Sequence, residues 1–122
     1  MNDPYNFEDE DIESDFLPNK RISQMTFGEK LERFKRFFDS SSRAMLQDCL
    51  FRLVEQEDGT ATLEILCPNE LVQQRLTKKR RKINNTIYTC WSHNYVKFFS
   101  LCVEQNGKFS CQKFSGGGYP VD

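Results

Sequence analysis

An amphipathic helix is the first element that the sequence predicts. Between residues 27 and 38 the apolar side chains recur at intervals that place them on one helix face, and they are Phe27, Leu31, Phe34 and Phe38. Just before this stripe, Thr26 and Glu29 have the spacing of a capping box, in which each side chain accepts a hydrogen bond from the other residue's backbone amide. The pattern predicts a helix that is capped by Thr26.

A second, shorter helix follows a polar interruption that begins at Asp39. Any of the serines at positions 40 to 42 can cap it, because a serine hydroxyl accepts from the free amides of a first helical turn. The apolar side chains that then face one side are Met45, Leu46, Cys49 and Leu50. We expect two short helices joined as a hairpin.

From Phe51 the apolar period changes to the two-residue period of a strand. Phe51 and Leu53 recur at this period, and Glu57-Asp58-Gly59 has the composition of a turn. Residues Thr60 to Cys67 then return as a second strand, in which alternate apolar side chains share one face. The pattern predicts a β-hairpin.

The stretch from Leu63 to Leu76 joins this strand to a third helix. Pro68 has no amide hydrogen and ends the strand, and Asn69 is a favourable residue to cap the helix that follows. The apolar side chains of this helix are Leu71, Val72, Leu76, Ile83 and Ile87. We expect the helix to bend or fray near Asn84 and Asn85.

The longest candidate strand spans Tyr95 to Glu104 and is apolar on both faces for part of its length, which is typical of a central strand. Asn106-Gly107 predicts a tight turn, and Lys108 to Phe114 a returning edge strand. The glycines at 116 to 118 predict a flexible tail. The fold class is therefore a small α+β domain with the order α-α-β-β-α-β and an extra C-terminal edge strand.

Charge divides the chain into two parts. Residues 1–19 hold seven carboxylates and no Lys or Arg, whereas residues 20–122 hold 17 basic and 11 acidic groups. We predict an acidic disordered arm over 1–24, an α+β interaction domain over 25–114 and a flexible tail over 115–122. The arm solvates the protein or covers its basic face; a short docking motif built from its aromatic residues is the alternative.

The strongest chemical feature is a run of five consecutive cations: Lys78, Lys79, Arg80, Arg81 and Lys82. They cannot all share one helix face, so they form a collar that would neutralise several phosphates and bind nucleic acid in a salt-dependent, sequence-independent way. Arg75 and Lys97 are candidates to extend this collar, and Tyr88, Trp91 and Tyr95 to stack on bases. The competing interpretation is a solvated charged face or a docking surface for the acidic arm.

Catalytic and metal-binding patterns are weak. Cys90, His93, Cys102 and Cys111 would supply four zinc ligands, but the second pair lacks a short knuckle spacing. Core or half-buried cysteines are the favoured interpretation. The chain shows no phosphate loop, no carboxylate pair suited to acid–base chemistry and no sign of an oxyanion site. We therefore predict a protein that is not an enzyme and needs no metal or cofactor.

The cysteine content and the hydropathy predict where in the cell the protein is located. Five cysteines form no regular disulfide framework and no charged-then-apolar leader precedes them, so a reducing cytoplasm is the predicted location. No apolar run approaches the roughly 18 to 20 residues that a spanning helix requires, so a membrane is not an expected partner.

The element order and the segment from Leu63 to Val72 resemble the N-terminal domain (domain I) of DnaA, the bacterial replication initiator. In that family the second strand ends in an Ala-Pro-Asn-x-Phe-Val type of segment; here the residues are Cys67-Pro68-Asn69-Glu70-Leu71-Val72. Cys67 replaces the small residue and Leu71 the aromatic. The resemblance spans Phe27 to Val103, and the chain is too short to hold the other domains of a full initiator. It implies a KH-like fold, which is also similar to DciA and to the C-terminal domain of the clamp-loader tau subunit.

The resemblance also implies adaptor work: contact with the replicative helicase or a regulator, and weak self-association. The family's helicase-contacting aromatic falls at Leu71, so Asn69, Glu70 and Leu71 carry over as the partner surface. Core packing is the favoured competing interpretation of Leu71, because an apolar residue in a first helical turn beside a strand is usually buried. The expected function is a non-enzymatic adaptor of the DNA-replication machinery that also contacts nucleic acid; the alternative is a stand-alone RNA- or DNA-binding regulator.

Overall fold

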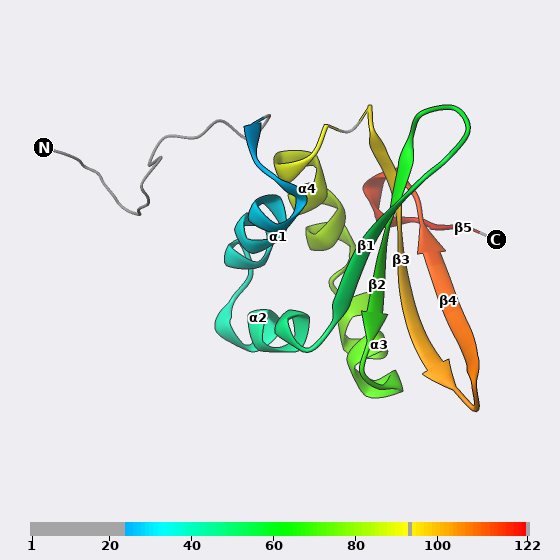
Figure 1. Ribbon diagram of the computed structural model, residues 1–122. Coiled ribbons are helices and arrows are strands. Elements are labelled where there is room, and N and C mark those ends of the chain that lie inside the picture. Colours follow the sequence, from blue (N-terminus) through cyan, green and yellow to red (C-terminus); the bar gives the residue numbers. More distant parts are fainter. Residues whose placement is uncertain (1–23, 93, 122) are drawn as a thin grey trace, which may run out of the picture. The chain divides into compact units, whose positions relative to one another are not determined.

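The computed structural model describes residues 24–92 and 94–121 (Figure 1). The predicted acidic arm lies outside them up to residue 23. The first helix, α1, spans Phe27–Arg36. The backbone amide of Thr26 donates to Oε1 of Glu29 at 2.8 Å, and that of Glu29 donates to Oγ1 of Thr26 at 3.2 Å, which confirms the capping box. The boundary between the chain's two compact units falls after Lys30, and the second unit contains the whole sheet.

The second unit is a small α+β domain (Figure 1). Its elements after α1 are α2 (Ser40–Gln47), β1 (Leu50–Glu55), β2 (Ala61–Cys67), α3 (Glu70–Thr77), α4 (Arg80–Cys90), β3 (Val96–Gln105), β4 (Lys108–Phe114), the 3-10 helix η3 (Gly116–Gly118) and β5 (Pro120–Val121). The predicted hairpin of β1 and β2 is present, and β4 has the predicted bounds.

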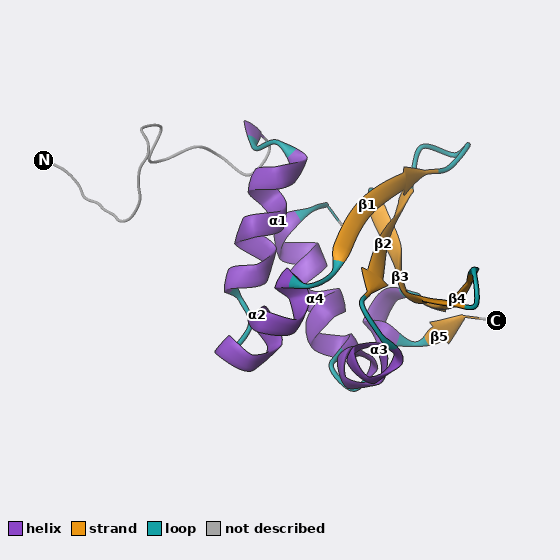
Figure 2. Ribbon diagram, turned by 60° about the horizontal axis from the view of Figure 1, so that its bottom comes forward, coloured by secondary structure: helices purple, strands orange, loops and turns teal. Residues whose placement is uncertain are grey.

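One mixed sheet connects all five strands in the order β1-β2-β3-β4-β5 (Figure 2). Strands β2 and β3 are parallel, and every other neighbouring pair is antiparallel. A parallel pair needs a crossover connection, and here α3 and α4 supply it. Strand β3 therefore has a partner on each side, as its apolar sequence predicted.

The core lies between the helices and one face of the sheet (Figure 2). On β2 the side chains on this face are Ala61, Leu63, Ile65 and Cys67, and all of them are buried. The ring of Phe34 in α1 lies 6.2 Å from that of Phe51 in β1 and 6.0 Å from that of Trp91. Burial of one such side chain contributes about 1.5 to 3 kcal/mol, so this cluster holds the second half of α1 against the sheet.

The first turn of α2 differs from the prediction. The capping residue is Asp39, not one of the three serines, because its Oδ1 accepts a hydrogen bond from the amide of Ser42 at 3.0 Å. The helix also ends earlier than its apolar stripe indicated, at Gln47, and Leu50 is already the first residue of β1.

The predicted third helix consists of two helices. Helix α3 ends at Thr77, and α4 begins at Arg80 and continues through Asn84 and Asn85, where a bend was expected. The expected position of the bend was wrong. The chain turns instead at Lys78 and Lys79, within the run of cations. Like charges three or four residues apart destabilise a continuous helix, and a turn at this point spreads them.

The C-terminal glycines do not form the flexible tail that the sequence predicted for 115–122. Gly117 and Gly118 both have a φ of 81°, a left-handed conformation that glycine adopts without steric cost. They reverse the chain within η3, and β5 then pairs with the end of β4, Pro120 opposite Phe114. Residues 115–121 are therefore part of the folded unit.

Candidate functional site

The five consecutive cations form one structural feature, the basic turn, which consists of Lys78, Lys79, Arg80, Arg81 and Lys82. The amide of Lys79 donates to the carbonyl of Leu76 at 2.9 Å, which closes a tight turn after α3. The backbone of Lys79, with φ −105° and ψ 19°, then leads into α4. No side chain caps α4 at Lys79. The positive end of the α4 dipole therefore coincides with the cations, and both favour a bound anion.

Three of these side chains are exposed: Lys78, Arg81 and Lys82. The half-buried Arg80 donates through Nη1 to the carbonyl of Thr77 at 3.3 Å. Nζ of Lys82 lies 5.9 Å from the centroid of the Phe38 ring. Lys78 and Arg81 have neither kind of contact among the described residues, so their charges face solvent.

Little negative charge opposes the basic turn. Within residues 24–92 and 94–121 the ion pairs join Glu32 to Lys35 and Glu64 to Arg52, and neither pair includes a residue of the turn. Asp39 is the nearby carboxylate: its pKa is lowered by hydrogen bonds from Ser42 and, to a smaller extent, by the charge of Lys79. The turn keeps most of its positive potential.

The C-terminal glycines support the basic turn. A Cβ atom at Gly118 would lie 3.1 Å from the carbonyl carbon of Arg80 and 3.2 Å from the amide nitrogen of Arg81. A side chain at position 118 would therefore be crowded against the first peptide of α4, which would have to move by a few tenths of an ångström. This contact could not be predicted from the sequence, because it joins residues far apart in the chain.

The structure places the other predicted phosphate ligands in different regions. Arg75 is exposed on α3, one turn before Lys78, and extends the basic surface. Lys97 is exposed at the start of β3, in the irregular register where Ala61 pairs with Val96. Hydrogen bonds from Thr60 lower the pKa of Asp58 in the β1–β2 turn, and the charge of Lys97 lowers it further to a smaller extent. The basic turn lies at the start of α4, whereas Lys97 follows the end of that helix and is therefore separate from the turn.

Of the three aromatic residues predicted to stack on bases, Trp91 is buried, with 3% of its surface exposed, and packs on Phe34. It is not a stacking platform. Tyr95 is half-buried and its hydroxyl donates to Oε2 of Glu55 at 3.2 Å. Tyr88 remains, since it is 38% exposed on α4, two turns after Arg81 and on the same helix face.

The predicted partner surface is only partly available. Asn69 caps α3, its side chain accepting from the amide of Val72 at 2.9 Å. Oε2 of Glu70 accepts from Nε2 of Gln105 at 3.1 Å. Leu71 is 54% exposed, so the interpretation of Leu71 as a core residue was wrong. Leu71 faces outward. The buried residue of α3 is Leu76, which lies toward the other end of the helix.

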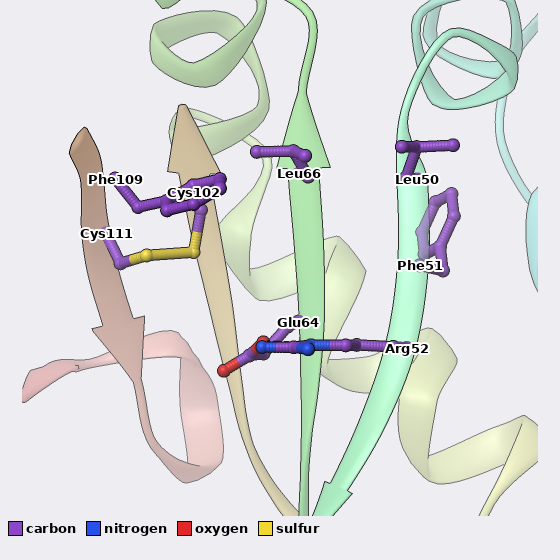
Figure 3. Close-up of a pocket in the computed structure, with 8 residues that line it drawn as sticks. All are labelled: Leu50, Phe51, Arg52, Glu64, Leu66, Cys102, Phe109 and Cys111. Carbon is purple, nitrogen blue, oxygen red and sulfur yellow. Dashed lines mark hydrogen bonds and ion pairs between the residues drawn. A yellow bond between two sulfur atoms is a disulfide. The ribbon is translucent and has the colours of Figure 1, made fainter. Parts of the chain in front are cut away.

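A groove that the sequence did not predict lies on the sheet face opposite the core (Figure 3). Four residues lie side by side there on neighbouring strands, from β1 to β4: Leu50, Leu66, Cys102 and Cys111. Phe109 extends from β4 over β3 toward Leu66, and the groove encloses about 400 Å³. Nε of Arg52 lies 2.6 Å from Oε1 of Glu64 at the polar end of the groove. Leu50 and Arg52 lie on the same face of β1 because they are two residues apart, and this pairing of an apolar with a charged residue is the signal that would have revealed the groove.

The interpretation of the cysteines as core or half-buried residues is confirmed for Cys90 and Cys102, whereas Cys111 is exposed on β4. Cys102 and Cys111 are joined by a disulfide, with 4.0 Å between their Cα atoms, and Cys49, Cys67 and Cys90 are buried thiols. A zinc site that uses Cys102 and Cys111 as thiolates is incompatible with this bond. In the described part of the chain, no three His, Cys, Asp or Glu side chains lie close enough together to hold a metal. His93, the fourth residue of that alternative, lies outside the described residues.

None of the described helices combines the length and the apolar character needed to span a membrane. Comparison of the chain with models of protein families, with curated proteins and with solved structures gave no match.

Proposed function

We propose that this chain is a non-enzymatic adaptor domain that binds nucleic acid through the basic turn and a protein partner through the first turn of α3. The order of helices and strands, together with the Pro68-Asn69 junction between β2 and α3, supports a KH-like domain similar to DnaA domain I. An adaptor of this kind has one surface that binds phosphates and another that binds a protein.

The observation that carries the proposal is the charge of the basic turn. Five cations occupy the junction of two helices, and Lys78 and Arg81 extend into solvent without a carboxylate partner among the described residues. Cations held this way displace the counterions of a phosphate backbone, which gives an affinity that falls steeply with salt. Arg75 and the exposed ring of Tyr88 flank the turn and would contact a single strand that runs along α4.

The test measures the binding of labelled single- and double-stranded oligonucleotides by the full chain across a salt series. In the double variant Lys78→Gln with Arg81→Gln we expect weaker binding at low salt. The slope of log affinity against log salt should become shallower by about 1.8 on duplex and about 1.4 on single strands, because each phosphate contact contributes about 0.9 or 0.7.

A matched control removes the same charge elsewhere. Lys97→Gln with Lys108→Gln changes two exposed cations on β3 and β4, away from the basic turn, and should leave the slope near that of the unmodified chain. Equal loss in the two double variants would mean that only net charge matters. No binding by the unmodified chain at low salt would exclude nucleic acid as the ligand of this turn.

A protein contact at α3 is supported by a different observation, the exposure of Leu71. Its side chain is held at the surface by a helix whose first turn is fixed by the Asn69 cap. We propose the replicative helicase as its partner, which should bind the full chain. Leu71→Lys should weaken that binding about tenfold or more, since it would bury a charge without a partner in an apolar contact. Sedimentation of the free chain tests the accompanying proposal of weak self-association.

The stand-alone regulator is the second candidate, favoured by the same cations. A stand-alone regulator would bind oligonucleotides but not the helicase. Leu71→Lys would then leave oligonucleotide binding unchanged. The adaptor predicts that Leu71→Lys abolishes the protein contact and leaves the salt slope of oligonucleotide binding unchanged, because Leu71 precedes the basic turn by about two helical turns.

A further inference from the structure

Four of the five cysteines fall into two pairs: one pair lies within the sheet, and in the other Cys49 directly precedes β1 while Cys67 ends β2. Cys102 of β3 pairs with Cys111 of β4 in the antiparallel register, and these two are bonded. The β1–β2 register places Leu50 opposite Leu66, so the next pair outward consists of Cys49 and Cys67. Both face the core, with 5% and 3% of their surfaces exposed.

The hydrogen-bond pattern of the hairpin shows which kind of pair this is. The amide of Gln56 donates to the carbonyl of Thr60 at 2.7 Å, which marks a hydrogen-bonded pair at the turn. Such pairs alternate with non-hydrogen-bonded ones along an antiparallel ladder, and the count places Cys49 and Cys67 at a non-hydrogen-bonded pair. Cα atoms at such positions lie about 4.5 Å apart, which is within the range that disulfides span.

The two thiols interact directly. Hydrogen bonding to Cys67, and then burial, raises the pKa of Cys49 far above its usual range, while the same hydrogen bond lowers the pKa of Cys67. Sγ of Cys49 also donates to the carbonyl of Met45 at 3.3 Å. The thiolate is the nucleophile in disulfide exchange, and the lowered pKa of Cys67 favours this form there.

We propose that Cys49 and Cys67 are a dithiol site that closes to a second disulfide with a small disulfide oxidant such as glutathione disulfide. The Cys67 thiolate attacks one sulfur of the oxidant, which breaks its S–S bond and releases one thiolate. The Cys49 thiol gives its proton to the released thiolate, and its sulfur displaces the second thiol from Cys67. Two protein thiols are oxidised to one disulfide, and the oxidant is reduced to two thiols.

This bond would join two connections at the end of the sheet where α3 begins. Cys49 directly precedes β1, and Cys67 directly precedes the Pro68-Asn69 junction that starts α3. Oxidation would therefore fix the first turn of α3 to the α2–β1 connection. The pairing depends only on the register and stands whether or not the chain binds nucleic acid.

The test is a peptide map of the full chain, because trypsin places each cysteine on a separate peptide: Ala44–Arg52, Leu53–Arg75, Ile83–Lys97, Phe98–Lys108 and Phe109–Lys113. The folded, reduced protein is treated with glutathione disulfide, its remaining thiols are alkylated, and the digest is analysed by mass spectrometry. We expect Ala44–Arg52 to be linked to Leu53–Arg75, at least about tenfold more abundant than any link to Ile83–Lys97, because the register brings Cys49 opposite Cys67 and so gives these two thiols the higher effective concentration.

Cys90 provides the internal control, since it is equally buried but lies in α4 and not in the sheet. Circular dichroism of the oxidised protein checks that the fold is retained. Alkylated, unlinked Ala44–Arg52 and Leu53–Arg75 would overturn the proposal, as would links that involve Cys90 to the same extent. A Cys49–Cys67 link that forms only in denaturant would overturn it as well.

Discussion

The side-chain oxygen of Asn69 accepts a hydrogen bond from the backbone amide of Val72 at 2.9 Å, and this contact fixes the start of α3. Asn69→Ala removes the acceptor and leaves an amide of the first turn without a partner. We expect the free energy of unfolding to fall by about 1 kcal/mol, as is usual for the loss of a capping residue. Urea unfolding monitored by circular dichroism measures the change.

The control for this cap is Asn69→Asp, which keeps an oxygen acceptor and should retain most of the stability. A stability of Asn69→Ala equal to that of the unmodified chain would show that the cap does not hold α3, and Asn69 would then be free to serve a partner.

Two leucines of the same helix should respond differently to truncation. Leu76 is fully buried, so Leu76→Ala should destabilise the protein by about 2 to 5 kcal/mol through lost burial and the cavity that remains. Leu71 is 54% exposed, so Leu71→Ala should change the free energy of unfolding by less than about 0.5 kcal/mol. Denaturant unfolding of both variants makes the comparison.

If Leu71→Ala proves as costly as Leu76→Ala, Leu71 is a core residue and the proposed partner surface at α3 is lost. Helix propensity does not confuse the comparison, because both changes introduce the same residue into the same helix.

Asp39 should make stability depend on acid pH. Hydrogen bonds from Ser42 lower its pKa in the folded protein below the ordinary value of 3.8. A carboxyl group with a lowered folded pKa stabilises the protein fully above pH 3.8, and this contribution is lost as the pH falls through the folded value. Urea unfolding at a series of pH values from neutral to below 3.8 should show that loss.

Asp39→Asn isolates this effect, because asparagine also caps helices but does not titrate. The decline of stability below pH 3.8 should be shallower in the variant than in the unmodified chain. Identical pH profiles would contradict a stabilising role for the Asp39 carboxylate.

A comparison of Gly118→Ala with Gly107→Ala distinguishes the cost of backbone strain from the cost of a steric contact. Both have positive φ values, 81° and 79°, so alanine at either position pays the cost of a left-handed conformation, about 1 to 2 kcal/mol. A Cβ at Gly107 meets nothing within 4 Å, whereas one at Gly118 lies 3.1 Å from backbone atoms of Arg80. Gly118→Ala should therefore destabilise the protein more than Gly107→Ala in thermal unfolding.

The difference between the two glycine variants reports the packing of η3 against the start of α4. Equal destabilisation would mean that this packing contributes nothing, and that residues 115–121 behave as the loose tail that the three glycines predicted.

Elements that depend on neighbouring residues were predicted well. Asn106-Gly107 specifies a two-residue turn, and β4 has the bounds that this turn and the alternation after it predict. Thr26 and Glu29, and Asn69 before α3, lie within three residues of the amides that they cap. These interactions are local, so the order of residue types contains the necessary information.

The candidate site was predicted less completely. The cations at 78 to 82 were identified from their sequence, but their placement at a turn, and the separation of Lys97 from them, were not. Trp91 was expected to be a stacking platform and is a core residue, because its ring packs on Phe34, 57 positions earlier in the chain. The groove beside Phe109 exists only where four strands meet.

The types of the elements, their caps, the hairpin turns and the concentration of positive charge follow from local sequence, because each depends on residues within a few positions of one another. Long-range packing sets the division of the third helix, the exposure of Leu71, the bond between Cys102 and Cys111, and the return of the C-terminal glycines to the sheet. Those outcomes depend on which distant segments pack together, and the free energy of that packing is set by the whole domain.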